Sequence, residues 1–185
     1  MHLERKIVER IRELTLNDMK HKTRTELLAS PAEELGELAR ELKIEFKTYG
    51  NGYKVADEGS KAEAVDLFIG AACLYFVDIE AENIPNSDFT YTLSHHAVGM
   101  FTSHIKCVKL KEFSGDIWKL FQKLCIMLGN CSTPYNSRDC LDFSQYALFV
   151  FTELGGTYEE FLATITEKLD KWEEKTKLDD IKVEA

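Results

Sequence analysis

Apolar residues recur at intervals of three and four along most of the chain, which places them on one face of an α-helix. Stretches that alternate apolar and polar residues, as strands do, are few, and the chain has only three prolines. The pattern therefore predicts an all-α protein built as a helical bundle. The predicted helices span residues 2–15, 18–29, 31–47, 61–82, 92–110, 114–129, 138–154 and 158–176.

Capping signals mark several of these predicted helix starts. Ser30, Pro31 and Glu33 match an N-cap serine, a proline at the first helical position and a capping-box glutamate. Thr157-Tyr-Glu-Glu160 has the same capping-box spacing, and so has Ser60 with Glu63. Glu33 and Glu63 therefore have a structural explanation, as caps, that stands beside any functional one.

The run from Leu67 to Val77 is apolar and uncharged, but it is about half as long as a membrane span must be. We interpret it as a buried helix, and no membrane partner is expected. An acidic pair opens this helix in 63–76, and another acidic pair opens 139–151. The similarity predicts a single all-α domain, 1–185, made of two related halves: 1–84 with the acidic motifs and a degenerate 85–185.

The second half is interpreted as degenerate because residues 117–128, the helix that would partner Asp139 and Asp142, contain no carboxylate. These two aspartates are read as acids favoured at a helix start by the helix dipole. They are not predicted to be metal ligands.

Composition narrows the function classes. A chain of 185 residues with 44% apolar residues can bury a real core. A net charge of -9 argues against nucleic-acid binding and means that an anionic ligand needs a bridging cation. The five cysteines form no C-x-x-C pair and the N-terminal residues lack a signal peptide's apolar core, so we expect a cytoplasmic setting with reduced, mostly buried cysteines.

Acidic residues on the helix predicted over 31–47 are gathered along one edge of its apolar face. The apolar sector comprises Leu35, Leu38, Ala39, Leu42 and Phe46. The acidic edge comprises Glu34, Glu37, Glu41 and Glu45. A solvated helix face usually mixes charges of both signs, because pairs of like charge one turn apart repel. The segregated glutamates therefore indicate a ligand that offsets their repulsion.

A second acidic motif, Glu63-x-x-Asp66, opens the uncharged helix, so its carboxylates enter a largely dry region. Buried carboxylates require a paired cation, a proton or a metal. If the two helices pack antiparallel, Glu34, Glu37, Glu63 and Asp66 meet in an all-oxygen cluster. Such a cluster suits Mg²⁺ or Mn²⁺ and offers zinc no soft ligand. The Glu-x-x-His motifs of a di-iron bundle are missing from the sequence.

The two motifs, E-E-x-x-E at 33–37 and E-x-x-D at 63–66, resemble the signature of the MazG-like all-α nucleoside triphosphate pyrophosphohydrolases, and the similarity extends over 5–80 and 139–176. The resemblance implies Mg²⁺-dependent hydrolysis of a (d)NTP to a (d)NMP and pyrophosphate. It implies that the metal is held by Glu34, Glu37, Glu63 and Asp66. It makes Glu33 the candidate for orienting or deprotonating the attacking water, and it admits a homodimer.

Four lysines are candidates for contacting the phosphates of the substrate: Lys47, Lys54, Lys168 and Lys171. The first two flank the acidic helix and the loop after it, and the last two lie in the terminal helix. Solvated surface lysines and ordinary helix packing explain the same positions.

Two other functions stay open. One is a non-catalytic helical interaction protein, in which the acids are caps and a solvated face. The other is a related all-α pyrophosphatase acting on another nucleotide, of the dUTPase-like or phosphoribosyl-ATP pyrophosphatase-like kind. Preference for a base or sugar depends on pocket shape and is not predicted.

Overall fold

The computed structural model describes residues 2–47, 59–82 and 115–183, and within these ranges it contains six α-helices and no strand. The helices are α1 (His2–Asp18), α2 (Arg24–Glu45), α3 (Ser60–Ala81), α5 (Ile117–Cys131), α6 (Ser137–Glu153) and α7 (Tyr158–Val183). The prediction of an all-α protein is confirmed. The helix predicted over 92–110 lies outside the described residues.

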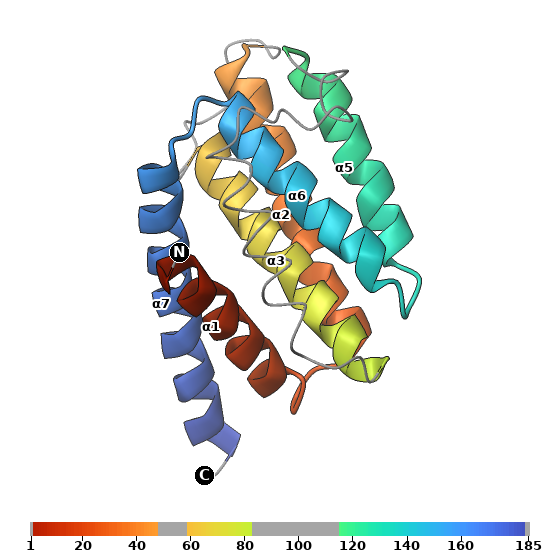
Figure 1. Cartoon of the computed structure of the whole chain (residues 1–185), viewed down its shortest axis with the longest axis vertical. Coiled ribbons are helices and arrows are strands. Elements are labelled where there is room, and N and C mark those ends of the chain that lie inside the picture. Colours follow the sequence, from red (N-terminus) through yellow and green to blue (C-terminus); the bar gives the residue numbers. More distant parts are fainter. Residues whose placement is uncertain (1, 48–58, 83–114, 184–185) are drawn as a thin grey trace.

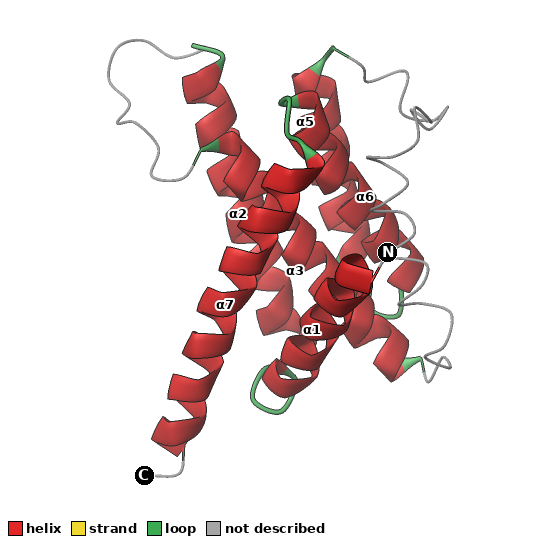
Figure 2. Ribbon diagram, turned by 60° about the vertical axis from the view of Figure 1, so that its left-hand side comes forward, coloured by secondary structure: helices red, strands yellow, loops and turns green. Residues whose placement is uncertain are grey.

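Helix α3 is the centre of the molecule. Helices α2 and α6 pack along it, and α5 packs against α6 (Figure 1). Helices α1 and α7 lie beside each other and cover another side of α3 (Figures 1 and 2). A hydrogen bond from Ser60 to Glu45 joins the start of α3 to the end of α2, and an ion pair between Arg24 and Asp78 joins their other ends. Helices α2 and α3 are therefore antiparallel.

The sequence of α3 explains its central position. Every residue from Leu67 to Val77 is buried, as the uncharged run predicted. A helix that is apolar all round has no solvent face and must be surrounded by other elements. In the described part of the chain, no helix combines the length and apolarity that crossing a membrane requires.

The predicted boundary between helices 18–29 and 31–47 is wrong. A single helix, α2, runs from Arg24 to Glu45 with Pro31 inside it, and its capping box is formed by Thr23 and Glu26 instead of Ser30 and Glu33. Pro31 cannot donate the hydrogen bond that the Leu27 carbonyl would accept, which normally disfavours a helix interior.

Tertiary packing explains why α2 continues through Pro31. The proline is buried against Gly70 of α3, and a Cβ atom built on that glycine would lie only 3.0 Å from the Cβ of Pro31. The proline ring therefore occupies space that the missing glycine side chain leaves. At Pro31, therefore, the contact between α2 and α3 overrides the local capping signals, which predicted that a helix starts there.

Other local predictions had mixed outcomes. The capping box of Thr157 and Glu160 is present: the Thr157 N–H donates to Glu160 over 2.8 Å, and the Glu160 N–H donates to the Thr157 hydroxyl over 3.2 Å. The capping explanation of Glu63 is wrong, because Gly59 is the N-cap and the Ser60 hydroxyl donates to Glu45. Phe46 was predicted to share the apolar face of α2, but it follows the last helical residue and is 47% exposed.

The described cysteines are mostly buried, as expected. Cys73, Cys131 and Cys140 are buried free thiols, whereas Cys125 is exposed on α5, contrary to the prediction. Cys107 lies outside the described residues.

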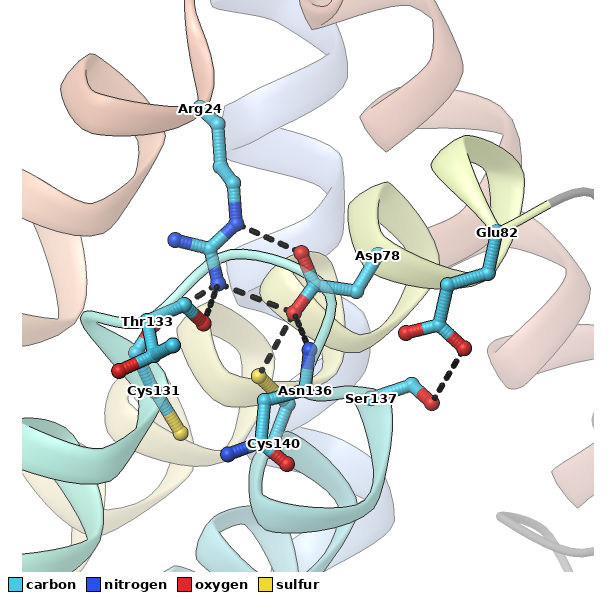
Figure 3. Close-up of polar contacts among 8 residues, drawn as sticks. All are labelled: Arg24, Asp78, Glu82, Cys131, Thr133, Asn136, Ser137 and Cys140. Carbon is cyan, nitrogen blue, oxygen red and sulfur yellow. Dashed lines mark hydrogen bonds and ion pairs between the residues drawn. The ribbon is translucent and has the colours of Figure 1, made fainter.

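A buried ion pair fastens the end of α3 to the start of α2 and to the junction between α5 and α6 (Figure 3). Asp78 has no exposed side-chain surface, and Arg24 donates to it through Nε over 2.6 Å and Nη2 over 2.9 Å. The same Nη2 donates to the carbonyl oxygen of Cys131 over 2.7 Å, and the N–H of Asn136 donates to Asp78 over 3.1 Å. We call this group, Arg24, Asp78, Cys131 and Asn136, the Asp78 latch.

Candidate functional site

Three glutamates from two helices meet beside the first turn of α3. Glu34 and Glu37 lie one turn apart on α2, and Glu63 lies in the first turn of α3. One carboxylate oxygen from each lies within 4.8 Å of the other two. We call Glu34, Glu37 and Glu63 the glutamate cluster. The antiparallel packing of α2 and α3 thus brings together three of the four carboxylates that were predicted as metal ligands.

Burial and like charges perturb this cluster. Burial, with the negative charges of Asp66, Glu63 and Glu37 added to it, raises the pKa of Glu34 to about 7. Burial also raises the pKa of Glu63 to about 7, with added repulsion from Glu37 and Asp66. A carboxyl group with such a pKa holds a proton over much of the neutral range, because its charged form has too little compensation. A divalent cation would supply that compensation.

Asp66, the fourth predicted ligand, lies next to the glutamate cluster but is held by a lysine. Its Oδ2 atom forms an ion pair with Nζ of Lys168, which comes from α7, 102 residues away in the sequence. The two side chains are only 19% and 13% exposed. The charge of Asp66 raises the pKa of Glu34 and of Glu63, and the charge of Lys168 lowers both. Asp66 and Lys168 are therefore electrostatically part of the same site.

A cavity of about 480 Å³ opens beside the cluster, between α2, α3 and α7. Glu34 of the glutamate cluster lines this cavity, and so does the neighbouring Asp66. The wall also contains four lysines and one tryptophan: Lys22, Lys168, Lys171, Lys175 and Trp172. Asp18 and Glu26 line the cavity too, and Asp18 pairs with Lys22 over 2.6 Å, so the cavity combines charges of both signs with an apolar ring, which is the character of a site for a charged or polar organic ligand.

The remaining predicted site residues lie outside the glutamate cluster. Glu33 is exposed on α2 and is not one of the three carboxylates that meet. Lys47 is exposed just beyond the end of α2. It is not among the described residues that line the cavity. Lys54 lies outside the described residues. Lys168 and Lys171 both line the cavity, and Lys171 also forms an ion pair of 3.0 Å with Glu167.

Sequence reasoning missed two lysines of the cavity wall and the buried Asp18 at the same wall. Lys175 follows Lys168 by seven residues, so helical periodicity places both on one face of α7, and this signal could have identified it. Lys22 and the 7% exposed Asp18 come from the end of α1 and the turn after it. No local pattern indicated that this turn approaches the cavity.

The outer part of the acidic edge on α2 has a structural role. Glu41 is only 2% exposed, and its Oε1 atom lies 3.3 Å from Nε of Arg40. Glu45 accepts the hydrogen bond from Ser60 at the start of α3. The acidic edge is therefore divided: Glu34 and Glu37 belong to the glutamate cluster, Glu41 is buried beside Arg40 of the same helix, and Glu45 joins α2 to α3.

The donor chemistry of the cluster fits a hard divalent cation. All its ligand atoms are carboxylate oxygens, which Mg²⁺ and Mn²⁺ prefer, and ligands about 2.1 Å from one Mg²⁺ lie about 3–4 Å from each other. Small side-chain rotations bring oxygens within 4.8 Å into that range. Comparisons of the chain with protein-family models, with curated proteins and with solved structures find no match.

Proposed function

We propose that this chain is a Mg²⁺-dependent nucleoside triphosphate pyrophosphohydrolase of the MazG-like kind, which converts a (d)NTP and water to a (d)NMP and pyrophosphate. Mn²⁺ is expected to replace Mg²⁺. The observation that carries the proposal is the meeting of Glu34, Glu37 and Glu63 at the edge of a cavity that lysines line. The cluster and the cavity together match a substrate that is both metal-binding and anionic.

Glu34, Glu37 and Glu63 would hold the cation, with Asp66 as a fourth ligand. The raised pKa of Glu34 and of Glu63 supports this assignment, because it reflects buried carboxylates whose charge the neighbouring Lys168 compensates only in part. When bound, the cation neutralises phosphate charge, activates a water and stabilises the departing pyrophosphate.

The chain's own residues would position the nucleotide. Lys168 and Lys171 face the cavity beside the cluster, where their ammonium groups can pair with phosphate oxygens. Trp172 offers an apolar face in the same wall. From the resemblance to the family, Glu33 would orient or deprotonate the attacking water. Lys47 and Lys54 flank the acidic helix and the loop after it in the sequence, and on that ground they would contact the outer phosphates.

The proposal extends to the architecture of two related halves and to a homodimer. Helices α2 and α3 form one antiparallel pair, and α5 and α6 form another, joined side to side through α3 and α6. Asp139 lies in the first turn of α6 as Glu63 lies in the first turn of α3. These parallels support descent of the second half from a copy of the first.

Pyrophosphate release, measured over a panel of ribonucleoside and deoxyribonucleoside triphosphates, tests the proposed reaction. We expect turnover with Mg²⁺ or Mn²⁺ and none with a chelator. Glu37→Gln should abolish metal binding and turnover while the helical circular dichroism stays unchanged, because the variant removes one charge from a crowded cluster. Glu13→Gln, a change of the same kind at an exposed position of α1, should have no effect.

The alternatives predict different results. A non-catalytic interaction protein would turn over none of the triphosphates and would bind Mn²⁺ equally with and without Glu37→Gln. A dUTPase-like or phosphoribosyl-ATP pyrophosphatase-like enzyme would act on dUTP alone or on phosphoribosyl-ATP alone. Either result would contradict the general triphosphate substrate.

A further inference from the structure

The ion pair between Asp66 and Lys168 places a positive charge inside the proposed cation site. Lys168 reaches Asp66 from α7, and both side chains are largely buried. The Lys168 ammonium donates a hydrogen bond to the carboxylate oxygen Oδ2 of Asp66. An ammonium on that oxygen competes with a divalent cation for it, and a positive charge beside the glutamate cluster weakens the binding of any further cation.

Lys168 also faces the cavity. Its side chain lines the same wall as Lys171, Lys175 and Lys22. A lysine ammonium is a point charge on a flexible four-carbon stem, so it can move between two anionic partners a few ångströms apart. An anion in the cavity is therefore an alternative partner for the Lys168 ammonium, which is paired with Asp66 in this structure.

We propose that Lys168 is a displaceable counter-cation of Asp66, which couples the binding of a divalent cation at the glutamate cluster to the binding of an anion in the cavity. Without an anion, Lys168 occupies Asp66 and the cation binds weakly through three carboxylates. With an anion, Lys168 moves to it and Asp66 joins the cation. The inference rests on the proposed function, because it assumes the cation site.

This coupling must act in both directions, since a ligand that raises the affinity of another is itself bound more tightly in return. As a consequence, neither the divalent cation nor the anion binds tightly in the absence of the other. In the framework of the proposed function, Lys168 is a positioning residue for Asp66 as well as a contact for phosphate. The coupling would favour a cation that arrives together with a nucleotide over a free one.

Titration of the full chain with Mn²⁺, followed by the electron paramagnetic resonance signal of free Mn²⁺, tests the first half of the proposal. Lys168→Met should bind Mn²⁺ on the order of tenfold more tightly than the natural chain, because a nearby positive charge is removed and Asp66 is released. Lys168→Arg keeps the charge and should keep the weak affinity.

Lys177→Met is the matched control. Lys177 lies on the same helix and forms an ion pair of 2.8 Å, but with Glu173 and not with Asp66. It should leave the Mn²⁺ affinity within about twofold of the natural value, since exposed charges are well screened. Circular dichroism of each variant shows whether the helices are retained.

Sodium sulfate, with sodium chloride at equal ionic strength as the reference, tests the second half as an inert phosphate mimic. Sulfate should tighten Mn²⁺ binding several-fold in the natural chain and leave Lys168→Met unchanged. The sulfate arm uses the natural chain, so it stays decisive if Lys168→Met does not fold.

The outcomes separate the two proposals. Mn²⁺ binding that Lys168→Met does not tighten, or that sulfate does not tighten in the natural chain, overturns the coupling and leaves the proposed function in place. Absence of Mn²⁺ binding in every variant, with and without sulfate, overturns both.

Discussion

Glu34 and Glu63 differ from ordinary surface carboxylates because each keeps its proton up to about pH 7. Burial is the main cause of both raised pKa values, and the neighbouring negative charges add to it. The side chain of Glu37, the third member of the cluster, is 41% exposed.

The raised pKa values predict how stability changes with pH in chelator-treated protein. In the unfolded chain both groups have pKa values near 4.5, so the folded state binds more protons between about pH 4.5 and 7. Their contribution is therefore present at acidic pH and is lost as the pH rises through 7. We expect the Tm of the natural chain to fall between pH 6 and 8.

Thermal unfolding followed by circular dichroism measures this slope. Glu34→Gln cannot ionise and should flatten it, and added Mg²⁺ should raise the Tm more at pH 8 than at pH 6, since the deprotonated cluster binds the cation. Equal pH slopes in the natural chain and in Glu34→Gln would contradict the assignment.

Helix α2 illustrates how contacts between elements override local signals. Ser30, Pro31 and Glu33 form a good helix start by local rules, but the helix begins at Arg24 and continues through the proline. The glycine that receives the proline lies on α3, 39 residues later, and the close approach of the two helices depends on its missing side chain. That approach also sets the separation between the two acidic motifs.

A pair of glycine substitutions tests this packing. In an open helical position, Gly→Ala stabilises by about 0.5–1 kcal/mol, and Gly36 on α2 has nothing within 4 Å of an added Cβ. Gly70→Ala should instead lower the free energy of unfolding, and Gly70→Val should lower it further, by about 1–3 kcal/mol, because the atoms nearest the added Cβ belong to the ring and backbone of Pro31 and not to the end of a flexible side chain.

Urea unfolding of the variants with Gly36→Ala as the reference measures the difference. If Gly70→Ala were as stabilising as Gly36→Ala, the tight contact with Pro31 would have no energetic effect and the explanation of the continuous α2 would be wrong.

At the scale of the whole molecule, polar contacts hold four helices together at the end of α3 that is distant from the glutamate cluster. Fifteen residues separate Glu63 from Asp78, which is about 22 Å along a helix. The Asp78 latch joins four helices through one fully buried carboxylate: α2 and α3 directly, and α5 and α6 through their connection. It holds the second helical pair against the first without contributing to the cavity.

Removing the arginine of the latch should strongly destabilise the fold. Arg24→Met leaves the buried Asp78 without its cation, and breaking such a pair costs about 3–5 kcal/mol. The exposed pair of Arg5 and Glu9 has side chains that are 70% and 44% exposed, so Arg5→Met should cost less than about 1 kcal/mol. Urea unfolding measures both variants, and equal losses would contradict a structural role for the latch.

Local sequence patterns accounted for features that depend on near neighbours. Helical periodicity, the uncharged run of α3 and the capping box at Thr157 all follow from residues a few positions apart, and each appears in the structure. The i, i+3 spacing of Glu34 with Glu37 was likewise enough to place them on one side of α2. Their meeting with Glu63 required one further assumption, antiparallel packing, which the structure bears out.

The sequence by itself determined the helical class, the buried central helix and the carboxylates available for a cation, because these depend on short-range spacing and side-chain chemistry. Only the tertiary structure decided that Pro31 stays inside a helix, that Lys168 holds Asp66 and that lysines from distant segments share one cavity. Those outcomes depend on which surfaces pack together across as many as 102 residues of sequence. The energy of such contacts comes from shape and burial, which no local pattern encodes.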